Sequence, residues 1–358
     1  MTHSTPSTHS TSTPSTHSTS TPSTHSTSTP STYVPDLGKP PDPVPVTSRA
    51  GGPAPASRRL RDWLGAFVFT VPALVLFGLL VLVPMGYAIY ISFFDWGGFG
   101  SPTDVTGFGN YTRLFKDPVF LGDLWRGGLL IGFSVVLQLP FALAMAVLLN
   151  QKLRGRAVYR MLFFAPYILS EVITGVLFGM IFAPGEGLAD KVLGAVGLDG
   201  LGGDWFAGRN TVLPTLFLVM TWKYFGFHMM LHLAGLQGIP AELHEAGRID
   251  GAGTWQRFRH ITLPLLAPTL RISAFLSVVF SIQLFDLVWV ITTGGPDHAS
   301  ETMAISMVQY GFKRYQMGYA SAISVVMFLI SLVFALAYQR FVLRRDTEGA
   351  IITMRANR

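Results

Sequence analysis

The segment Glu245–Pro264, with the sequence EAGRIDGAGTWQRFRHITLP, is a polar and charged stretch between two strongly apolar runs. Pro240 precedes it at a place where a helix can begin, because a proline in the first turn gives up no N–H group that the helix needs. Leu243, Ala246 and Ile249 then recur every three residues, as on one face of a short helix. The pattern predicts a short helix here.

A turn and a second helix are indicated by the residues that follow. Asp250-Gly251 is typical of a turn, with Gly251 free to take a positive φ after the helix end. Thr254 is placed to cap a second short helix, and Pro264 to close it just before the next apolar run. We expect a helix–turn–helix at the membrane surface between two spans, an element suited to gripping another protein.

The same residues resemble the EAA loop of binding-protein-dependent ABC import permeases. Nine residues separate Gly251 from Ile261, and the matching positions are Glu245, Ala246, Asp250, Gly251, Ala252, Ile261, Leu263 and Pro264. Gly247 stands where that family usually has alanine, a change that costs a helix about 1 kcal/mol and is tolerable. With further matches at 234–240 and 294–296, the chain resembles the carbohydrate branch, specifically its maltose-type or glycerol-phosphate-type first permease, over roughly residues 60 to 345.

The resemblance implies an all-α integral membrane protein with six transmembrane helices and a cytoplasmic coupling helix between spans four and five. It implies a permease subunit that is not itself an enzyme and that takes up a sugar or sugar-like solute. The expected partners are a second homologous permease subunit in a heterodimer, two copies of a cytoplasmic ABC ATPase, an extracellular or periplasmic solute-binding protein and the lipid bilayer. The expected location is the bacterial cytoplasmic (inner) membrane. Glu245 is expected to contact the ATPase, although an acidic residue also suits the first turns of a helix dipole.

Composition is far from the balance of a soluble globular protein. Hydrophobic residues make up 49% and charged residues 13% of the chain, and the mean hydropathy is +0.42, which indicates a membrane protein. The absence of cysteine excludes disulfides, thiolate metal sites and a cysteine nucleophile. The chain also lacks a Walker A motif, so it cannot be its own ATPase. No cofactor or metal is expected.

The first 57 residues are of low complexity. The octad THSTSTPS repeats at 8–15, 16–23 and 24–31, and a Pro/Gly-rich linker follows. Such a segment buries too little apolar surface to offset the entropy of ordering it, so we predict disorder. Its histidines have no accompanying carboxylate or thiolate, which favours a solvated tail over a metal site. The expected organisation is a tail and linker over 1–57, a permease domain over 58–345 and a cytoplasmic tail over 346–358.

Six apolar runs are long enough to cross a hydrocarbon core of about 30 Å. They are approximately Leu64–Tyr90, Gly127–Leu149, Val158–Phe182, Val212–Gln237, Leu265–Thr292 and Met317–Leu343. Soluble core helices of this length and apolarity would be unusual. We therefore expect six spans.

Lysine and arginine are distributed unequally between the segments that flank these runs. Sixteen lie on one side: Arg58, Arg59, Arg61, Lys152, Arg154, Arg156, Arg160, Arg248, Arg257, Arg259, Arg271, Arg340, Arg344, Arg345, Arg355 and Arg358. Seven lie on the other: Arg113, Lys116, Arg126, Lys191, Arg209, Lys313 and Arg314. The positive-inside rule then predicts that both termini and the EAA loop are cytoplasmic. The net charge of +6 reflects this topology, and nucleic acid is not an expected partner.

Polar and aromatic residues within two of the spans could form a sugar pathway. A sugar needs hydrogen bonds to its hydroxyl groups and aromatic faces for its C–H surfaces. The candidate pathway residues are Trp222, Lys223, Tyr224, Gln283 and Asp286, and in the resembled family the sugar sits at these helices near mid-membrane. Lys223 and Asp286 could instead form a structural ion pair. The sequence leaves both readings open, and it leaves open a sugar or a glycerol-phosphate-like solute.

Other ionisable groups in the spans have structural explanations. His228 and His232 share a helix face at spacing i,i+4, which favours helix packing or pocket lining over a metal site. His244-Glu245 begins like the HExxH motif of zinc proteases, but position 248 is an arginine, so the motif fails.

Two other function classes fit the sequence less well than an importer does. An ion-coupled secondary transporter of a polar solute could use Glu171, Asp286 or His232 as a titrating group, but such folds have inverted repeats and broken mid-membrane helices, and the sequence indicates neither. An intramembrane enzyme would need converging catalytic groups, which the spans do not offer.

Overall fold

The computed structural model describes residues 67–343 apart from 69, 152, 199 and 201. Within this part of the chain every regular element is a helix, and β structure is limited to one isolated bridge between Phe94 and Val105. The expected all-α class is therefore confirmed. The predicted tails over 1–57 and 346–358 lie outside the described residues.

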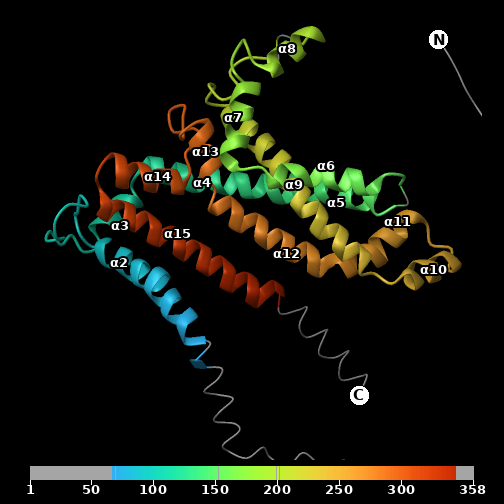
Figure 1. Ribbon diagram of the computed structural model, residues 1–358, viewed down its shortest axis with the longest axis horizontal. Coiled ribbons are helices and arrows are strands. Elements are labelled where there is room, and N and C mark those ends of the chain that lie inside the picture. Colours follow the sequence, from blue (N-terminus) through green and yellow to red (C-terminus); the bar gives the residue numbers. More distant parts are fainter. Residues whose placement is uncertain (1–66, 69, 152, 199, 201, 344–358) are drawn as a thin grey trace, which may run out of the picture. The chain divides into compact units, whose positions relative to one another are not determined.

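The described chain consists of α-helices and short π-helical turns joined by loops (Figure 1). The α-helices are α2 (Val83–Ile91), α3 (Gly109–Leu114), α4 (Pro118–Phe133), α5 (Leu139–Leu149), α6 (Arg156–Ile168), α7 (Glu171–Ile181), α8 (Leu188–Ala195), α9 (Val212–Gln237), α10 (Ala241–Ile249), α11 (Thr254–Arg257), α12 (Leu263–Ile282), α13 (Asp286–Ile291), α14 (Met303–Val308) and α15 (Met317–Tyr338). The π-helical turns are η1 (Gly78–Leu82), η2 (Ser134–Gln138), η4 (Phe258–Thr262), η5 (Gln309–Lys313) and η6 (Gln339–Leu343).

Four helical stretches of the described chain are long and apolar enough to cross a membrane, the third with a short break at 283–285. They are Thr70–Ile91, Pro118–Leu149, Thr254–Ile291 and Met317–Val342, and the bent pair α6 and α7 makes a fifth candidate. The predicted fourth span is helix α9, whose 26 residues extend about 39 Å at 1.5 Å per residue. Helix α9 is less apolar than those stretches, since Lys223 and two histidines interrupt it.

The third predicted span, Val158–Phe182, is not one straight helix. It consists of α6 and α7, which are bent by 97° at a short break. Leu169 and Ser170 adopt extended backbone there, each with ψ 144°. Pro166 lies just upstream and contributes no N–H group, which weakens the end of α6. The expectation that no span is broken is wrong at this position.

Three of the π-helical turns end two residues before a proline. Pro84, Pro140 and Pro264 are each the second residue after a π-helical turn, namely after η1, η2 and η4. In a regular α-helix a proline ring clashes with the carbonyl four residues earlier and leaves it without a donor. The wider π turn contains that carbonyl in all three cases and absorbs the defect, so the long helices continue through their prolines.

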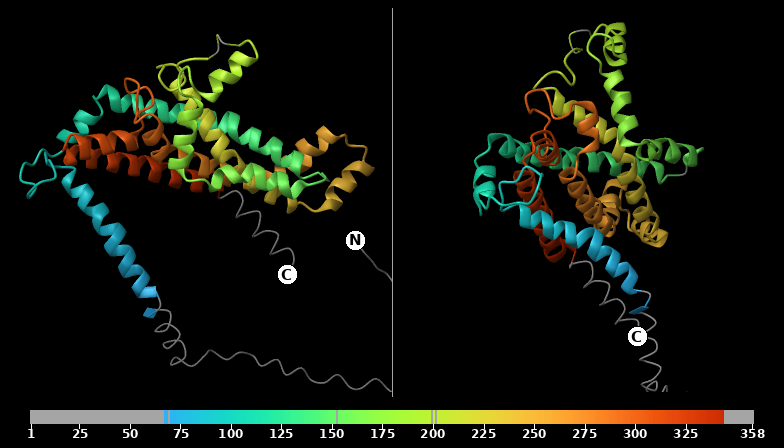
Figure 2. Two further views of the ribbon diagram at one scale, coloured as in Figure 1. Left: turned by 45° about the horizontal axis from the view of Figure 1, so that its top comes forward. Right: turned by 60° about the vertical axis from the view of Figure 1, so that its left-hand side comes forward.

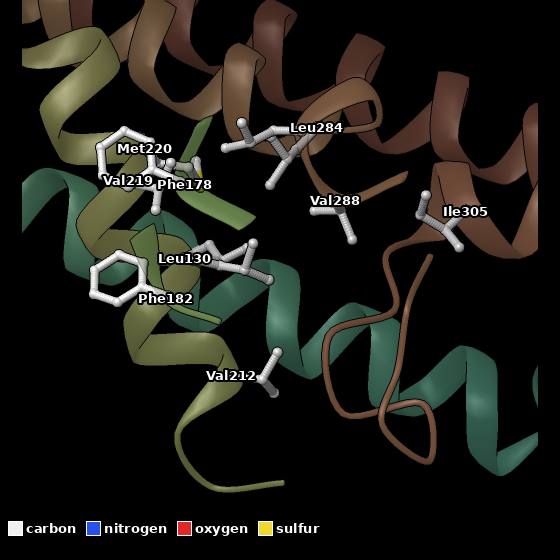
Figure 3. Close-up of a cluster of buried hydrophobic side chains, with 11 residues drawn as sticks. Leu130, Phe178, Phe182, Val212, Val219, Met220, Leu284, Val288 and Ile305 are labelled. Atoms are coloured by element: carbon white, nitrogen blue, oxygen red, sulfur yellow. The ribbon is translucent and has the colours of Figure 1, made fainter. Parts of the chain in front are cut away.

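Helix α9 lies at the centre of the packing, in contact with α5, α6 and α12. Its N-terminal half joins a cluster of buried apolar side chains contributed by α4, α7, α9, α13 and α14 and by the link between α12 and α13 (Figure 3). The labelled members are Leu130, Phe178, Phe182, Val212, Val219, Met220, Leu284, Val288 and Ile305. Helices α10 and α11 project at one end of the bundle, and α14 lies at the other (Figures 1 and 2).

Candidate coupling surface and membrane cavity

The first helix of the motif segment is α10, which begins at Ala241 directly after Pro240. It ends at Ile249, and Gly251 follows with φ +77°. The Ala252 N–H group donates to the Gly247 carbonyl at 2.9 Å, closing the helix end. The predicted short helix, and the turn with a positive φ at Gly251, are confirmed.

The second helix differs in two details from the sequence prediction. Gly253, not Thr254, is the N-cap of α11, and its N–H group donates to the Gln256 side chain at 2.8 Å. Pro264 does not close the helix, because the π turn η4 carries it on into α12. The motif is thus a short helix and a turn joined without interruption to a long span.

Gly247 has a packing reason to differ from alanine. A Cβ atom placed there would lie 3.0 Å from Ile261 Cδ1 and 3.4 Å from the Arg257 side chain. Gly247 is buried in the angle between α10 and α11. The missing methyl group allows the two helices to approach closely.

The outer face of α10 and the start of α11 expose both charged and large apolar side chains. Ile249 is 87% exposed and Trp255 is 68% exposed. Among the motif residues, Glu245, Ala246, Asp250, Gly251 and Pro264 are exposed, whereas Ala252, Ile261 and Leu263 are half-buried. Exposed aromatic and aliphatic groups rimmed by polar residues are typical of protein interaction sites. The part of this surface on α10 that comprises Glu245 and Ile249, with the adjoining Asp250 and Gly251, is called the coupling surface below.

A cavity of about 460 Å³ lies where the break between α6 and α7 meets α9 and the start of α13. It brings together Lys223, Tyr224, Gln283 and Asp286, four of the five candidate pathway residues. The other lining residues are Tyr167, Leu169, Ser170, Glu171, Phe280, Leu284 and Phe285. Its walls combine charged groups, an amide and aromatic rings, the chemistry that a sugar requires.

Trp222 lies outside this cavity. Its ring packs edge-to-face against Phe178, with ring centroids 4.9 Å apart. It also borders a separate apolar cavity of about 380 Å³ together with Leu162, Pro166 and Phe225. The adjacent residues 222 and 223 point in different directions on α9, because successive helix positions are 100° apart.

The buried ammonium of Lys223 pairs with Glu171 and not with Asp286. Lys223 Nζ donates to the Leu169 carbonyl at 2.6 Å and lies 3.9 Å from Glu171 Oε1. The Tyr224 hydroxyl donates to the same Glu171 oxygen. Because α6 ends at the break, the Leu169 carbonyl has no helical N–H group to bond to and can accept from Lys223 instead. The bend therefore supplies one partner of the lysine.

Sequence reasoning missed the contribution of the α6–α7 break to the cavity. Tyr167 stacks on Phe227 with ring centroids 4.9 Å apart, and Tyr224 stacks on Phe280 at 6.0 Å. Pro166 followed by Leu169-Ser170-Glu171 was the available signal, since a proline near a serine and a glutamate is typical of a helix end and a new helix start. The sequence offers Glu171 only as a titrating group of the alternative secondary transporter, not as part of a sugar pathway.

The two histidines of α9 are buried in the helix bundle. His228 Nδ1 and the Ser273 hydroxyl of α12 are hydrogen-bonded at 2.8 Å. Both ring nitrogens of His232 are buried without a hydrogen-bond partner among the described residues. His228 therefore serves helix packing, one of the two roles expected for it.

Comparison with known proteins gives consistent matches over most of the chain. The chain is 33% identical over 288 residues to the sulfoquinovosyl glycerol transport system permease protein of Agrobacterium fabrum, covering 80% of this chain and 93% of that protein. It is 32% identical over 313 residues to the diacetylchitobiose uptake system permease protein of Streptomyces coelicolor, covering 84% and 88%.

A solved structure has the same fold. It is the crystal structure of a bacterial ABC transporter involved in the import of the acidic polysaccharide alginate, with a TM-score of 0.68 at 22% identity, covering 80% of this chain and 99% of that one. The family model for the binding-protein-dependent transport system inner membrane component matches residues 138–347. The chain belongs to the family of inner membrane components of binding-protein-dependent transport systems.

Proposed function

We propose that this chain is a permease subunit of an ABC importer that takes up a neutral sugar delivered by a solute-binding protein. The observation that carries the proposal is the cavity that joins Lys223, Tyr224, Gln283 and Asp286 within a chain of this family. The chain is not an enzyme, and ATP hydrolysis belongs to a separate subunit. The names of relatives, which include lactose and diacetylchitobiose transport permeases, support a sugar as the solute.

The charge of the cavity favours a neutral solute over a phosphorylated one. Lys223 is the one cation among the lining residues, and Glu171 and Asp286 are two carboxylates. The lysine is already bonded to the Leu169 carbonyl and lies beside Glu171. An anionic solute would meet the exposed carboxylate of Asp286 without a free cation to offset it. Neutral hydroxyl groups can bond to both carboxylates and to Gln283.

The coupling surface supplies the contact to the ATPase in this proposal. Glu245 and Asp250 supply exposed carboxylates on and after α10, which projects from the end of the bundle (Figure 1), and Gly251 forms the turn that follows. In this proposal both termini and the coupling surface lie in the cytoplasm. Residues 58–345 cross the membrane six times, with α9 as one span and the bent pair α6 and α7 together as another. It pairs the chain with a second homologous permease, two ATPase copies and a periplasmic or extracellular binding protein.

The test is reconstitution of the permease, its ATPase and its binding protein in proteoliposomes. Uptake of a neutral disaccharide such as lactose or diacetylchitobiose should require ATP and should persist when proton and sodium gradients are dissipated. Glycerol 3-phosphate should not be taken up. Uptake that needs an ion gradient and no ATP would establish the secondary transporter instead.

A variant in the cavity tests the pathway itself. Gln283→Ala should lower sugar uptake several-fold while the ATPase stays bound, because an amide that bonds sugar hydroxyls contributes roughly 1 kcal/mol. Gln237→Ala, at the far end of α9, is the matched control and should leave uptake unchanged. Equal uptake by the two variants would remove Gln283 from the pathway.

A further inference from the structure

Two adjoining cavities lie at the coupling end of the bundle, and the proposed transport function uses neither. The larger, about 600 Å³, is lined by Pro140, Leu143 and Ala144 of α5 and by Trp255 and Phe258. The smaller, about 220 Å³, extends between α10 and the end of α5. Val147, Thr254 and Phe258 border both cavities. An apolar groove thus adjoins a polar cleft.

The polar cleft is lined by basic side chains. His244, Arg248 and Arg257 border it, and none of its lining residues is an aspartate or a glutamate. Neither guanidinium forms an ion pair or a side-chain hydrogen bond with a residue that the structure describes. Two arginines at one cleft that have no partner among the described residues are suited to an anion, since arginine binds phosphate oxygens in a bidentate manner.

The cleft is separate from the coupling surface. His244 and Arg248 are four residues apart on α10 and border the cleft, whereas Glu245 and Ile249, also four apart, lie on an adjacent stripe of the helix. The carboxylates of Glu242 and Glu245 on α10 and of Asp250 just after it are exposed and do not line the cleft. An ATPase on the coupling surface therefore leaves the cleft accessible from the side of α5.

We propose that an anionic phospholipid binds here, with its phosphate between Arg248 and Arg257 and an acyl chain in the groove along Leu143, Ala144 and Trp255. The site lies at the end of the candidate span Pro118–Leu149, where hydrocarbon gives way to headgroups. Basic pockets between spans on the cytoplasmic side bind anionic headgroups, and tryptophan favours this depth. The inference rests on the cytoplasmic placement of this end proposed above. A soluble phosphate would fill the cleft but would leave the groove empty.

The test measures lipid retained by the complete, purified importer after exchange into mixed micelles of dioleoylphosphatidylglycerol and dioleoylphosphatidylcholine. Mass spectrometry should find phosphatidylglycerol, and not phosphatidylcholine, bound to the complex. Removing one basic side chain should lower retention roughly fivefold, the factor that corresponds to its attraction to an anionic headgroup. Arg248→Gln with Arg257→Gln should therefore lower retention roughly 25-fold, and Ala144→Phe, which fills the groove without changing charge, should also lower it.

The matched control removes two exposed arginines at the start of the neighbouring helix α6, one just before it and one in its first turn. Arg154→Gln with Arg156→Gln deletes the same charge at the same end without touching the cleft, and it should retain lipid like the parent chain. Millimolar inorganic phosphate should not displace the bound lipid. Equal retention of the two lipids, equal loss in the control, displacement by phosphate, or a partner permease helix cross-linked into the groove would each overturn the site. ATP-dependent sugar uptake would persist in all four cases, so the importer proposal would stand.

Discussion

At one end of the bundle the polar side chains bond to one another, whereas at the other end they are left exposed. At the α14 end, Asp123 Oδ1 bonds Arg126 Nη2 at 2.5 Å, and the Ser306 hydroxyl lies 2.5 Å from Asp123 Oδ2 and 2.8 Å from Glu301 Oε1. Arg126 also donates to the Glu301 carbonyl at 2.9 Å. At the α10 end, Glu245 and Arg248 are exposed.

A second cluster strengthens the α14 end. Asp117 caps α4 and accepts hydrogen bonds from the hydroxyls of Tyr310 and Tyr319 at 2.9 and 2.8 Å. Burial would raise the pKa of Asp117, but these bonds and the backbone N–H groups of α4 outweigh it and hold the pKa below its ordinary value. One end is therefore bonded within this chain, while the other keeps its polar groups for partners. Changes at the first should therefore alter stability, and changes at the second should alter assembly.

The largest effect is expected from Asp123→Ala. The change leaves Arg126 with an uncompensated charge and removes a partner of Ser306, so the free energy of unfolding should fall by about 3–5 kcal/mol. Thermal unfolding in detergent measures it. The control is Asp297→Ala, which breaks an ion pair with Arg209 whose two side chains are 69% and 71% exposed; an exposed pair contributes little. Equal destabilisation by both variants would contradict the contrast between the ends.

Gly251→Val tests the turn at the coupling surface. Valine at φ +77° costs about 1–2 kcal/mol, so ATPase association should fall roughly tenfold while the unfolding temperature of the bundle changes little. Gly253→Val introduces the same side chain at φ −65°, which valine tolerates. Co-purification of the ATPase with each variant measures the difference, and equal yields would show that the shape of this turn is unimportant for assembly.

Glu245→Lys tests the charge of the coupling surface. The change replaces an exposed carboxylate with a cation, and we expect roughly threefold weaker ATPase binding, with a difference that shrinks as salt is raised. Glu242→Lys, in the first turn of the same helix, is the control and should have a smaller effect. ATPase binding by both variants, measured at low and at high ionic strength, tests this prediction. A loss of binding that does not depend on salt would indicate that Glu245 has a role other than charge.

The smallest effect is a pH dependence at the α8 lobe, residues 183–211. Asp190 accepts hydrogen bonds from Trp205 Nε1 at 2.7 Å and from the N–H groups of Gly185 and Gly203, which lower its pKa from 3.8. A lowered folded-state pKa gives stability that is present above pH 3.8 and lost as the pH falls through the folded value. Trp205 fluorescence should change only below about pH 3.8. Asp190→Asn should remove that change, and a transition that survives the substitution would assign it to another group.

The helices and turns that depend only on residues adjacent in the sequence could be predicted from it. Apolar run length predicted the long helices, and Asp250-Gly251 predicted a turn with positive φ, because both are properties of a few consecutive residues. The helix through Pro264 could not be predicted, since it depends on a π turn whose stability comes from packing. Sequence spacing also could not decide between Glu171 and Asp286 as the partner of Lys223, because the 97° bend determines which carboxylate approaches.

The π-helical turns before Pro84, Pro140 and Pro264 have a consequence for how this chain aligns with its relatives. Each such turn holds one residue more than an α-helical turn of the same rise. A relative that lacks the proline has no need of the extra residue and can delete it without rotating the rest of the helix by 100°. Single-residue gaps are therefore expected inside the membrane helices at 78–82, 134–138 and 258–262, where alignment rules ordinarily forbid them. Each gap should coincide with the loss of the proline that follows.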